Sequence, residues 1–218
     1  MIVTIDGPAG AGKSTASRML AKRLGFQFLD TGAMYRAVTL AAITRKVDLD
    51  DPEALAQVAR EVEIRFVDGD VLLDGFTVTQ AIRSEDVTEN VGAIADTPEV
   101  REHLVELQRR IASKGNFVCE GRDQGTVVFP ESPCKFFLTA SAEERAKRRV
   151  DQLHESGHSA DFDATVRQQN ERDDRDMSRP VGRLLKADDA IEVNTDHKTL
   201  GEVVDHLEQI VLSRIVRR

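Results

Sequence analysis

The sequence predicts an α/β protein in which a mainly parallel sheet is covered by helices. Three observations predict it: short buried-strand runs alternate with helical stretches, a glycine-rich loop joins the first strand to the first helix, and the composition is ordinary for a globular chain. With 40% apolar and 31% charged residues, the 218-residue chain is long enough for one packed domain with insertions. We therefore expect a three-layer α/β/α fold.

The strand and helix signals follow one another along the chain. Residues 1–5 form a short apolar, partly β-branched run that suits a buried parallel strand. Residues 14–24 repeat apolar side chains at helical spacing and stop at Gly25, a C-cap signal. Further strands are predicted at 117–119, 135–138 and 190–193, and further helices at 98–113, 142–153 and 200–215.

The middle of the chain has a different pattern. Short strand-like runs at 62–67, 71–74 and 76–78 are separated by turns at 68–70 and 74–75, which contain Asp-Gly pairs typical of tight hairpins. We interpret this stretch as a small antiparallel insert carried by the core. No internal repeat and no linker rich in Pro, Gly or Ser indicates a second independent domain.

Composition narrows the classes of function. Asp and Glu outnumber Lys and Arg by 38 to 30, which argues against a protein that binds nucleic acid or an anionic membrane through its overall charge. No apolar run approaches the ~20 residues of a membrane span, and the first residues do not show the pattern of a signal peptide for export. Cys119 and Cys134 lack the spacing of a zinc site. We expect a cytoplasmic protein with buried, reduced thiols.

The glycine-rich loop carries the strongest chemical signal. Residues 7–14, GPAGAGKS, satisfy the pattern G-x-x-x-x-G-K-[ST] between a predicted strand and a predicted helix. Glycines let the backbone curl so that N–H groups point inward, and the helix N-terminus adds partial positive charge where phosphates rest. The motif predicts a P-loop that binds ATP, in which Lys13 bridges the β- and γ-phosphates and Ser14 binds Mg²⁺. The predicted ATP-binding residues are Gly7, Pro8, Ala9, Gly10, Ala11, Gly12, Lys13, Ser14 and Thr15.

A P-loop enzyme needs a carboxylate near its magnesium, typically at the end of a neighbouring strand. Glu120, which ends the run 117–119, is one candidate. Asp30, which ends the run 26–29, is the rival and would act through a bridging water.

Arginines stand where an anionic second substrate would need them, because a guanidinium matches phosphate oxygens at two points. Arg172, Arg175, Asp176 and Arg179 are spaced to share one helix face, although Pro180 predicts that Arg179 lies just past the helix end. The alternative is a solvated face of mutual salt bridges. The other candidates are Arg36, Arg83, Arg101 and Arg122, the last beside Asp123.

A second basic cluster precedes a polar stretch at 155–163 that has the composition of a mobile loop. A lid closing over a triphosphate would need such residues, because phosphoryl transfer must exclude water. An exposed charged helix is the alternative. The predicted lid arginines are Arg145, Arg148 and Arg149.

Taken together, these motifs resemble those of the bacterial cytidylate kinases, which are nucleoside monophosphate kinases. The resemblance runs through the whole chain and rests on four segments: the phosphate loop with Ile5 and Asp6, 29–36 (LDTGAMYR), 120–130 (EGRDQGTVVFP) and 171–176 (ERDDRD). The first segment is shared by many nucleotide enzymes, whereas the other three together are specific to this family.

The resemblance implies a function in pyrimidine nucleotide metabolism: transfer of the γ-phosphoryl group of ATP to CMP or dCMP, with Mg²⁺ required, giving ADP and CDP or dCDP. It implies a core at about 1–35, 97–148 and 166–218, an acceptor-binding α+β insert at about 36–96 and a lid at about 149–165. It also implies a CMP site formed by Thr31, Tyr35, Arg36, Arg101, Arg122, Asp123, Arg172, Asp176 and Arg179. Lys13, Arg122, Arg172 and Arg179 would carry the charge that develops during transfer.

One position departs from the family pattern. Where many members carry a small hydroxyl residue near the base, this chain has Gly92. A base contact at that position is therefore not expected. The reaction needs no strong general base, since the acceptor phosphate is already deprotonated.

Two other functions are compatible with parts of this sequence. Another small-molecule P-loop kinase, for a different nucleotide or for an alcohol such as shikimate, is the nearest rival, but the arginine motifs favour a phosphorylated acceptor. A GTP-binding switch would need an N-K-x-D motif, and residues 194–198 (NTDHK) lack that order. That segment, following a late strand, is instead a candidate for the adenine pocket.

We expect a monomer that has ATP and CMP or dCMP as partners.

Overall fold

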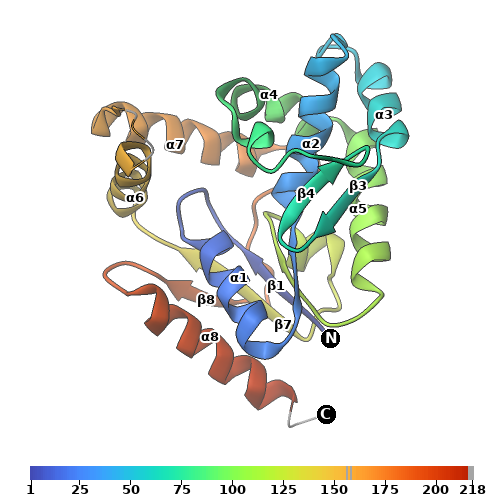
Figure 1. Cartoon of the computed structure of the whole chain (residues 1–218). Coiled ribbons are helices and arrows are strands. Elements are labelled where there is room, and N and C mark those ends of the chain that lie inside the picture. Colours follow the sequence, from blue (N-terminus) through green and yellow to red (C-terminus); the bar gives the residue numbers. More distant parts are fainter. Residues whose placement is uncertain (156, 158, 216–218) are drawn as a thin grey trace. The chain divides into compact units, whose positions relative to one another are not determined.

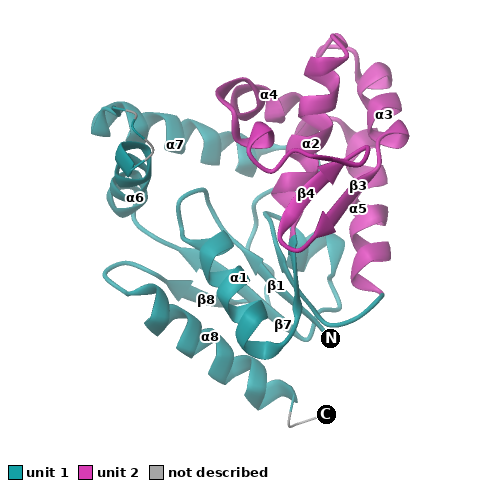
Figure 2. Cartoon of the chain, viewed as in Figure 1, with its two compact units in different colours: residues 1–29, 114–218 teal, residues 30–113 magenta. Residues whose placement is uncertain are grey.

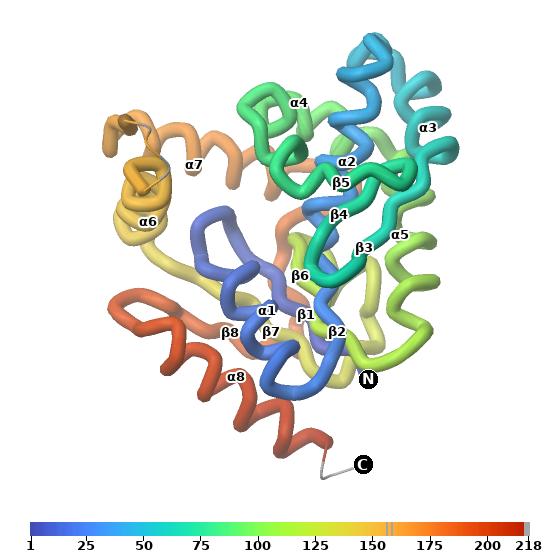
Figure 3. The backbone as a smooth tube through the Cα atoms, in the orientation of Figure 1, coloured from blue at the N-terminus to red at the C-terminus, as the bar shows by residue number. Residues whose placement is uncertain are grey.

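The centre of the fold is a five-stranded sheet with the strand order β2-β6-β1-β7-β8. Strands β1 (Ile2–Asp6), β6 (Phe117–Glu120), β7 (Cys134–Thr139) and β8 (Ile191–Asn194) run parallel to their neighbours, and β2 (Gln27–Asp30) lies at the edge beside β6 (Figure 3). The computed structural model describes residues 1–155, 157 and 159–215. The predicted α/β class, with a mainly parallel sheet and helices, is confirmed.

Burial explains why β1 lies at the centre of this sheet. Its side chains from Val3 to Asp6 are all buried, which suits a strand covered on both faces. Helices α1 (Lys13–Leu24) and α8 (Leu200–Ile215) pack against each other (Figure 1). Their apolar side chains, such as Leu20 and Leu207, join those of the strands in one buried cluster. The hydrophobic effect therefore holds the loop that follows β1 on a rigid base.

The chain divides into two compact units, 1–29 with 114–218 and 30–113 (Figure 2). The first unit holds the parallel sheet, α1 and α8, together with the π-helical turn η2 (Gln124–Val128), α6 (Ala142–Glu155) and α7 (Phe162–Ser178). The second unit is longer than the insert expected at 36–96. It is longer because a helix that begins at Thr31 and another that begins at Pro98 pack with the helices inside that range.

The second unit contains four α-helices and a small sheet among its described residues. The helices are α2 (Thr31–Thr44), α3 (Pro52–Glu61), α4 (Glu85–Asp96) and α5 (Pro98–Ala112), and a 3-10 turn, η1 (Ala81–Arg83), precedes α4. Asp30, Asp51 and Ser84 cap α2, α3 and α4 through side-chain oxygens that accept backbone N–H groups.

The predicted antiparallel strands are confirmed as β3 (Ile64–Val67), β4 (Asp70–Leu73) and β5 (Phe76–Thr77). Both turns place an Asp-Gly pair in the left-handed region, with φ of 50° at Asp68 and 90° at Gly69, and 50° at Asp74 and 85° at Gly75. Positive φ at both central residues matches the right-handed twist of a hairpin. The first strand begins later than predicted, because Val62 ends α3.

The predicted lid, at about 149–165, includes Ser156 and His158, which lie outside the described residues. On either side, α6 continues to Glu155 and α7 begins at Phe162, so the polar stretch at 155–163 lies partly within the two helices. These helices pack against each other (Figure 1). Among the helices that the structure describes, none is long and apolar enough to cross a membrane.

Candidate active site

The phosphate loop connects β1 to α1 and bends in ways that require glycine. The φ angles of Gly7, Gly10 and Gly12 are 142°, 79° and 83°, values that residues with a Cβ rarely adopt. A Cβ on Gly7 would lie 2.0 Å from the carbonyl oxygen of Leu138 in β7. The loop is therefore shaped by close backbone contact as well as by its own flexibility.

Three side chains hold carbonyl groups of this loop. Lys13 Nζ donates to Pro8 O at 2.7 Å, and Arg145 Nη1 donates to Ala9 O at 3.0 Å. Thr195 Oγ1, just beyond β8, lies 3.3 Å from Ala11 O. Each contact stabilises one peptide orientation, so the loop is organised before any anion arrives.

Lys13 is buried, with only 4% of its surface exposed. Burial lowers the pKa of this amine well below its usual range, and the nearby Arg122 and Arg172 lower it further, whereas Glu120 opposes the shift. Cations crowded in this way create a positive potential that a polyphosphate would relieve. The electrostatics of the loop thus favour an anionic ligand.

Glu120, at the end of β6, lies beside the start of α1. Ser14 Oγ donates to Glu120 Oε2 at 3.0 Å, and Lys13 Nζ lies 3.9 Å from Glu120 Oε1. A hydroxyl and a carboxylate are hard oxygen donors of the kind Mg²⁺ prefers. Within the described ranges no group of three or more His, Cys, Asp or Glu side chains could hold a metal alone. These residues therefore fit an ion that takes its other ligands from phosphates and water.

The rival carboxylate, Asp30, has a structural role within the second unit. Its Oδ1 accepts the backbone N–H of Ala33 at 2.9 Å, which caps α2, and its Oδ2 lies 3.6 Å from Arg83. Arg83 is one of the predicted acceptor-side arginines. Both oxygens of Asp30 thus already have partners in that unit.

The arginine motifs from β6 and α7 meet at Asp176. Its carboxylate accepts from Arg122 Nε at 2.9 Å and pairs with Arg179 Nη2 at 2.8 Å. Burial alone would raise the pKa of Asp176, but Arg122, Arg179 and then Arg172 hold it below its usual value. The result is a cluster in which several guanidinium groups share one buried carboxylate.

The predicted helix face needs one correction. Arg175 is exposed and donates to the carbonyl of Glu171 on its own helix, so it does not join the cluster. Asp173 is buried instead and faces the phosphate loop. The position of Arg179 is confirmed, because α7 ends at Ser178 and Arg179 has extended ψ of 142°.

The structure separates the three predicted lid arginines. Arg145 is buried and forms an ion pair with Asp173. Arg148 donates to Thr195 Oγ1 at 3.0 Å and to Thr195 O at 2.8 Å. Arg149 is exposed and donates to Gln152 on the same helix. Arg145 and Arg148 therefore lie beside the phosphate loop, whereas Arg149 does not contact it.

In the second unit, Tyr35 and Arg101 come together, with the Arg101 guanidinium 5.4 Å from the centre of the Tyr35 ring. Arg36 Nη1 donates to Thr88 Oγ1 at 2.8 Å and to Ile82 O at 3.3 Å. Thr31 is buried in the first turn of α2. Gly92 lies within α4, and a Cβ added there would meet only Asp96, at 4.0 Å.

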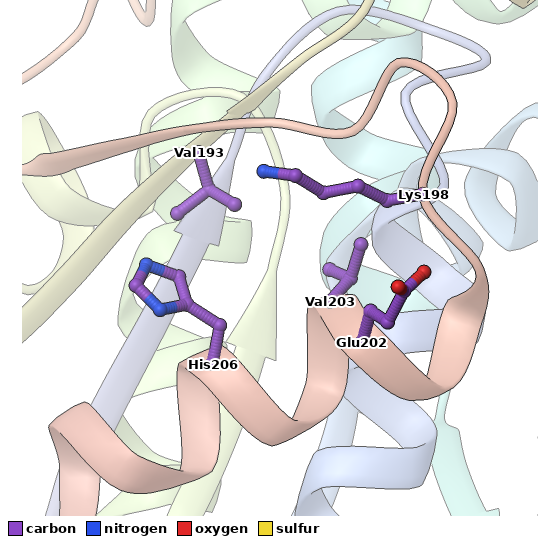
Figure 4. A pocket seen from close by; sticks show the side chains of 5 residues that line it. All are labelled: Val193, Lys198, Glu202, Val203 and His206. Atoms are coloured by element: carbon purple, nitrogen blue, oxygen red, sulfur yellow. The ribbon is translucent and has the colours of Figure 1, made fainter.

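A pocket of about 240 Å³ lies next to the segment 194–198 in the first unit (Figure 4). Val193 of β8, Lys198, and Val203 and His206 of α8 line it together with Glu202. Lys198 Nζ donates to Asn194 O at 2.8 Å, which closes the loop before α8. The candidate adenine segment thus borders this pocket, while its Thr195 contacts the phosphate loop.

Two residues at the site, Asp173 and Asp6, had no functional role in the sequence-based prediction, and Thr195 was named only within the candidate adenine segment 194–198. Thr195 contacts Ala11 and Arg148, and Asp173 contacts Ala9 and Arg145. Asp6, at the end of β1, accepts N–H groups from Gln124 at 2.9 Å and Gly125 at 2.8 Å. The sequence signals for Asp6 were its place at the end of a buried strand and its membership, with Ile5, of the first segment of the family resemblance.

Asp6 makes the unfolding free energy depend on pH. Burial raises its pKa from 3.8 to about 7, against the hydrogen bonds from Gly125 and Gln124. Since the folded pKa is the higher one, the folded state binds more protons between these values, and stability falls as pH rises through that window. Relative to Asp6→Asn, the wild type should lose up to about 1.4 kcal/mol per pH unit between pH 4 and 7 in urea unfolding.

The matched control for this experiment is Asp174→Asn, at an exposed position. Its unfolding free energy should follow that of the wild type at every pH. Parallel curves for the wild type and Asp6→Asn would show that Asp6 has no raised pKa.

The fold and the anion-organising loop define a protein of the P-loop nucleotide-binding class. The solved structure of shikimate kinase from Bacteroides thetaiotaomicron is similar in fold, with a TM-score of 0.50 and 12% identity over 97% of this chain and 98% of that one. Residues 3–213 match the family model for cytidylate kinase. The cytidylate kinase of Rhodopirellula baltica is 48% identical over 97% of this chain and 92% of its own length. That of Carboxydothermus hydrogenoformans is 46% identical over 97% of both chains.

The chain belongs to the cytidylate kinase family. It is therefore a kinase, a transferase that uses a nucleotide as phosphoryl donor. The predicted family resemblance is confirmed.

Proposed function

We propose that this kinase transfers the γ-phosphoryl group of ATP to CMP or dCMP, giving ADP and CDP or dCDP. The observation that carries the proposal is that two cationic sites of the first unit, Lys13 in the phosphate loop and the arginines around Asp176, lie close together. Lys13 belongs to the phosphate loop, and Arg122 and Arg172 are close enough to lower its pKa. Lys13 suits the triphosphate, and the arginines suit the phosphate of a second substrate.

In the reaction, an oxygen of the acceptor phosphate attacks the γ-phosphorus of ATP. The bond to the β,γ-bridging oxygen breaks, and ADP leaves with the electron pair. The acceptor oxygen is already ionised, so no side chain needs to remove a proton. Lys13, Arg122, Arg172 and Arg179 hold the two anions together and balance the charge that develops.

Magnesium bound with ATP would be held by Ser14, with Glu120 beside it, and would neutralise phosphate charge. The short distance between these oxygens supports Glu120 over Asp30, whose oxygens cap α2 and meet Arg83. Residues 7–15 bind ATP in this proposal, while Arg145, Arg148 and Arg149 belong to the lid at about 149–165 and the helix that precedes it.

The proposed CMP contacts belong to both units of the chain. Thr31, Tyr35, Arg36 and Arg101 come from the second unit, whose range at about 36–96 is the proposed acceptor-binding insert. The stacking of Arg101 on Tyr35 supports a shared role for these two residues. Arg122, Asp123, Arg172, Asp176 and Arg179 come from the first unit. In this proposal the enzyme is monomeric and cytoplasmic and acts in pyrimidine nucleotide metabolism.

The test is a comparison of acceptors with ATP as donor. We expect kcat/KM for CMP and dCMP to be at least about tenfold higher than for UMP, AMP or shikimate. A tenfold ratio corresponds to about 1.4 kcal/mol, the size of one lost contact in the transition state. ADP release is followed by a coupled assay, and CDP or dCDP is identified by chromatography. Faster turnover with AMP or shikimate would overturn the assignment.

A further inference from the structure

Asp173 reaches the phosphate loop from α7. It is buried, with 6% of its surface exposed, and its Oδ1 accepts the backbone N–H of Ala9 at 3.4 Å. Its Oδ2 pairs with Arg145, which comes from α6. Asp173 thus connects α7 to α6 and to the phosphate loop.

Arg145 completes a closed set of contacts around Ala9. Its Nη1 donates both to Asp173 and to the carbonyl oxygen of Ala9, the latter at 3.0 Å. The N–H and the C=O of one loop residue are therefore held by an acidic and a basic side chain that also hold each other.

Packing around this ion pair leaves little space for the loop to move. A Cβ built on Gly10 would lie 3.0 Å from Arg145 Cβ and 3.1 Å from Gln169 Nε2. Gln169, one turn before Asp173 on α7, donates to the carbonyl of Arg145 at 3.3 Å. The two helices and the loop thus form one close-packed junction.

We infer that Asp173 is a positioning residue that, with Arg145, fixes the phosphate loop at Ala9 and thereby sets the affinity for the triphosphate. The inference rests on the proposed function, since it names a determinant of the donor site. Ordering a loop in advance removes a cost that would otherwise reduce binding. Because Asp173 contacts the loop and not the reacting atoms, it acts through Ala9.

The same helix separates this role from the acceptor side. Asp176, one turn later, pairs with Arg122 and Arg179 and has no contact with the loop among those that the structure describes for its carboxylate. Asp173 should therefore affect ATP, and Asp176 should affect the acceptor phosphate.

The experiment measures KM for ATP, KM for CMP and kcat in Asp173→Asn. Asparagine keeps the size and an acceptor for Ala9 but removes the charge that Arg145 needs. We expect KM for ATP to rise about tenfold, as suits the loss of one charge-assisted contact, while KM for CMP stays within about twofold. Calorimetric titration with ATP alone should show the same tenfold loss of affinity.

The matched control is Asp174→Asn, at the next position, which is exposed. It should keep all three kinetic values. Equal loss for ATP and CMP in Asp173→Asn, or unchanged ATP affinity, would overturn the inference. If that variant does not fold, Gln169→Leu removes the hydrogen bond to the Arg145 carbonyl at the same junction, and it too should raise KM for ATP without changing KM for CMP.

The two proposals fail in different ways. If wild-type protein binds ATP but does not phosphorylate CMP, the proposed acceptor is wrong, and the calorimetric comparison still decides the role of Asp173. If the wild type phosphorylates CMP and the Asp173→Asn variant binds ATP normally, only the role of Asp173 is wrong.

Discussion

Lys13→Ala is expected to lower kcat with ATP and CMP by about a thousandfold while leaving the fold intact. Lys13 is buried beside the loop carbonyl of Pro8, in a position to neutralise phosphate charge. Because burial, and then Arg122 and Arg172, disfavour the charged form of this amine, its removal should leave the protein folded even though the contact with Pro8 O is lost. Steady-state kinetics and thermal unfolding monitored by circular dichroism measure the two effects.

The control is Lys22→Ala, which removes an exposed lysine from the last turn of the same helix. It should keep wild-type turnover and an unchanged melting temperature. Wild-type turnover in Lys13→Ala would exclude the proposed mechanism, and an unfolded variant would show that Lys13 is needed for folding.

Arg122→Ala should damage both the acceptor site and the stability of the first unit. Arg122 is the partner of Asp176 at 2.9 Å, and its loss leaves a buried carboxylate with less compensation. Since Asp176 keeps Arg179 at 2.8 Å, we expect the low end of the cost of breaking a buried pair, about 3 kcal/mol in urea unfolding. KM for CMP should rise about a hundredfold, while ATP binding changes much less.

Arg175→Ala serves as the control for this variant, because Arg175 is exposed on α7 and outside the cluster around Asp176. Its stability should stay within about 0.5 kcal/mol of the wild type. An unchanged KM for CMP in Arg122→Ala would remove that arginine from the proposed acceptor site.

Local signals predicted the elements around the phosphate loop well. The run at 1–5 became β1, and the helical spacing at 14–24 became α1, which ends at Gly25 with φ of 65°. Both predictions succeeded because strand burial, helical periodicity and the glycine C-cap depend on neighbouring residues. The Asp-Gly turns at 68–69 and 74–75 succeeded for the same reason.

Patterns that depend on contact between distant elements were harder to predict. Helical spacing placed Arg175 with Arg172 and Asp176, but spacing alone does not say which side of α7 is buried. The packing of α7 against α6 buries Asp173 instead. Similarly, composition predicted a polar loop at 155–163, while both helices extend into that stretch.

The sequence by itself determined the class of chemistry, because a glycine loop with Lys13 and Ser14 needs only adjacent residues to form a phosphate site. Its motifs also predicted the family, since the three specific segments at 29–36, 120–130 and 171–176 can be recognised from the sequence without knowledge of the fold. Only the tertiary structure decided what holds that loop in place. Arg145 lies 136 residues from Ala9 and Thr195 lies 184 residues from Ala11, and only folding of the sheet and its helices brings such groups within hydrogen-bonding distance.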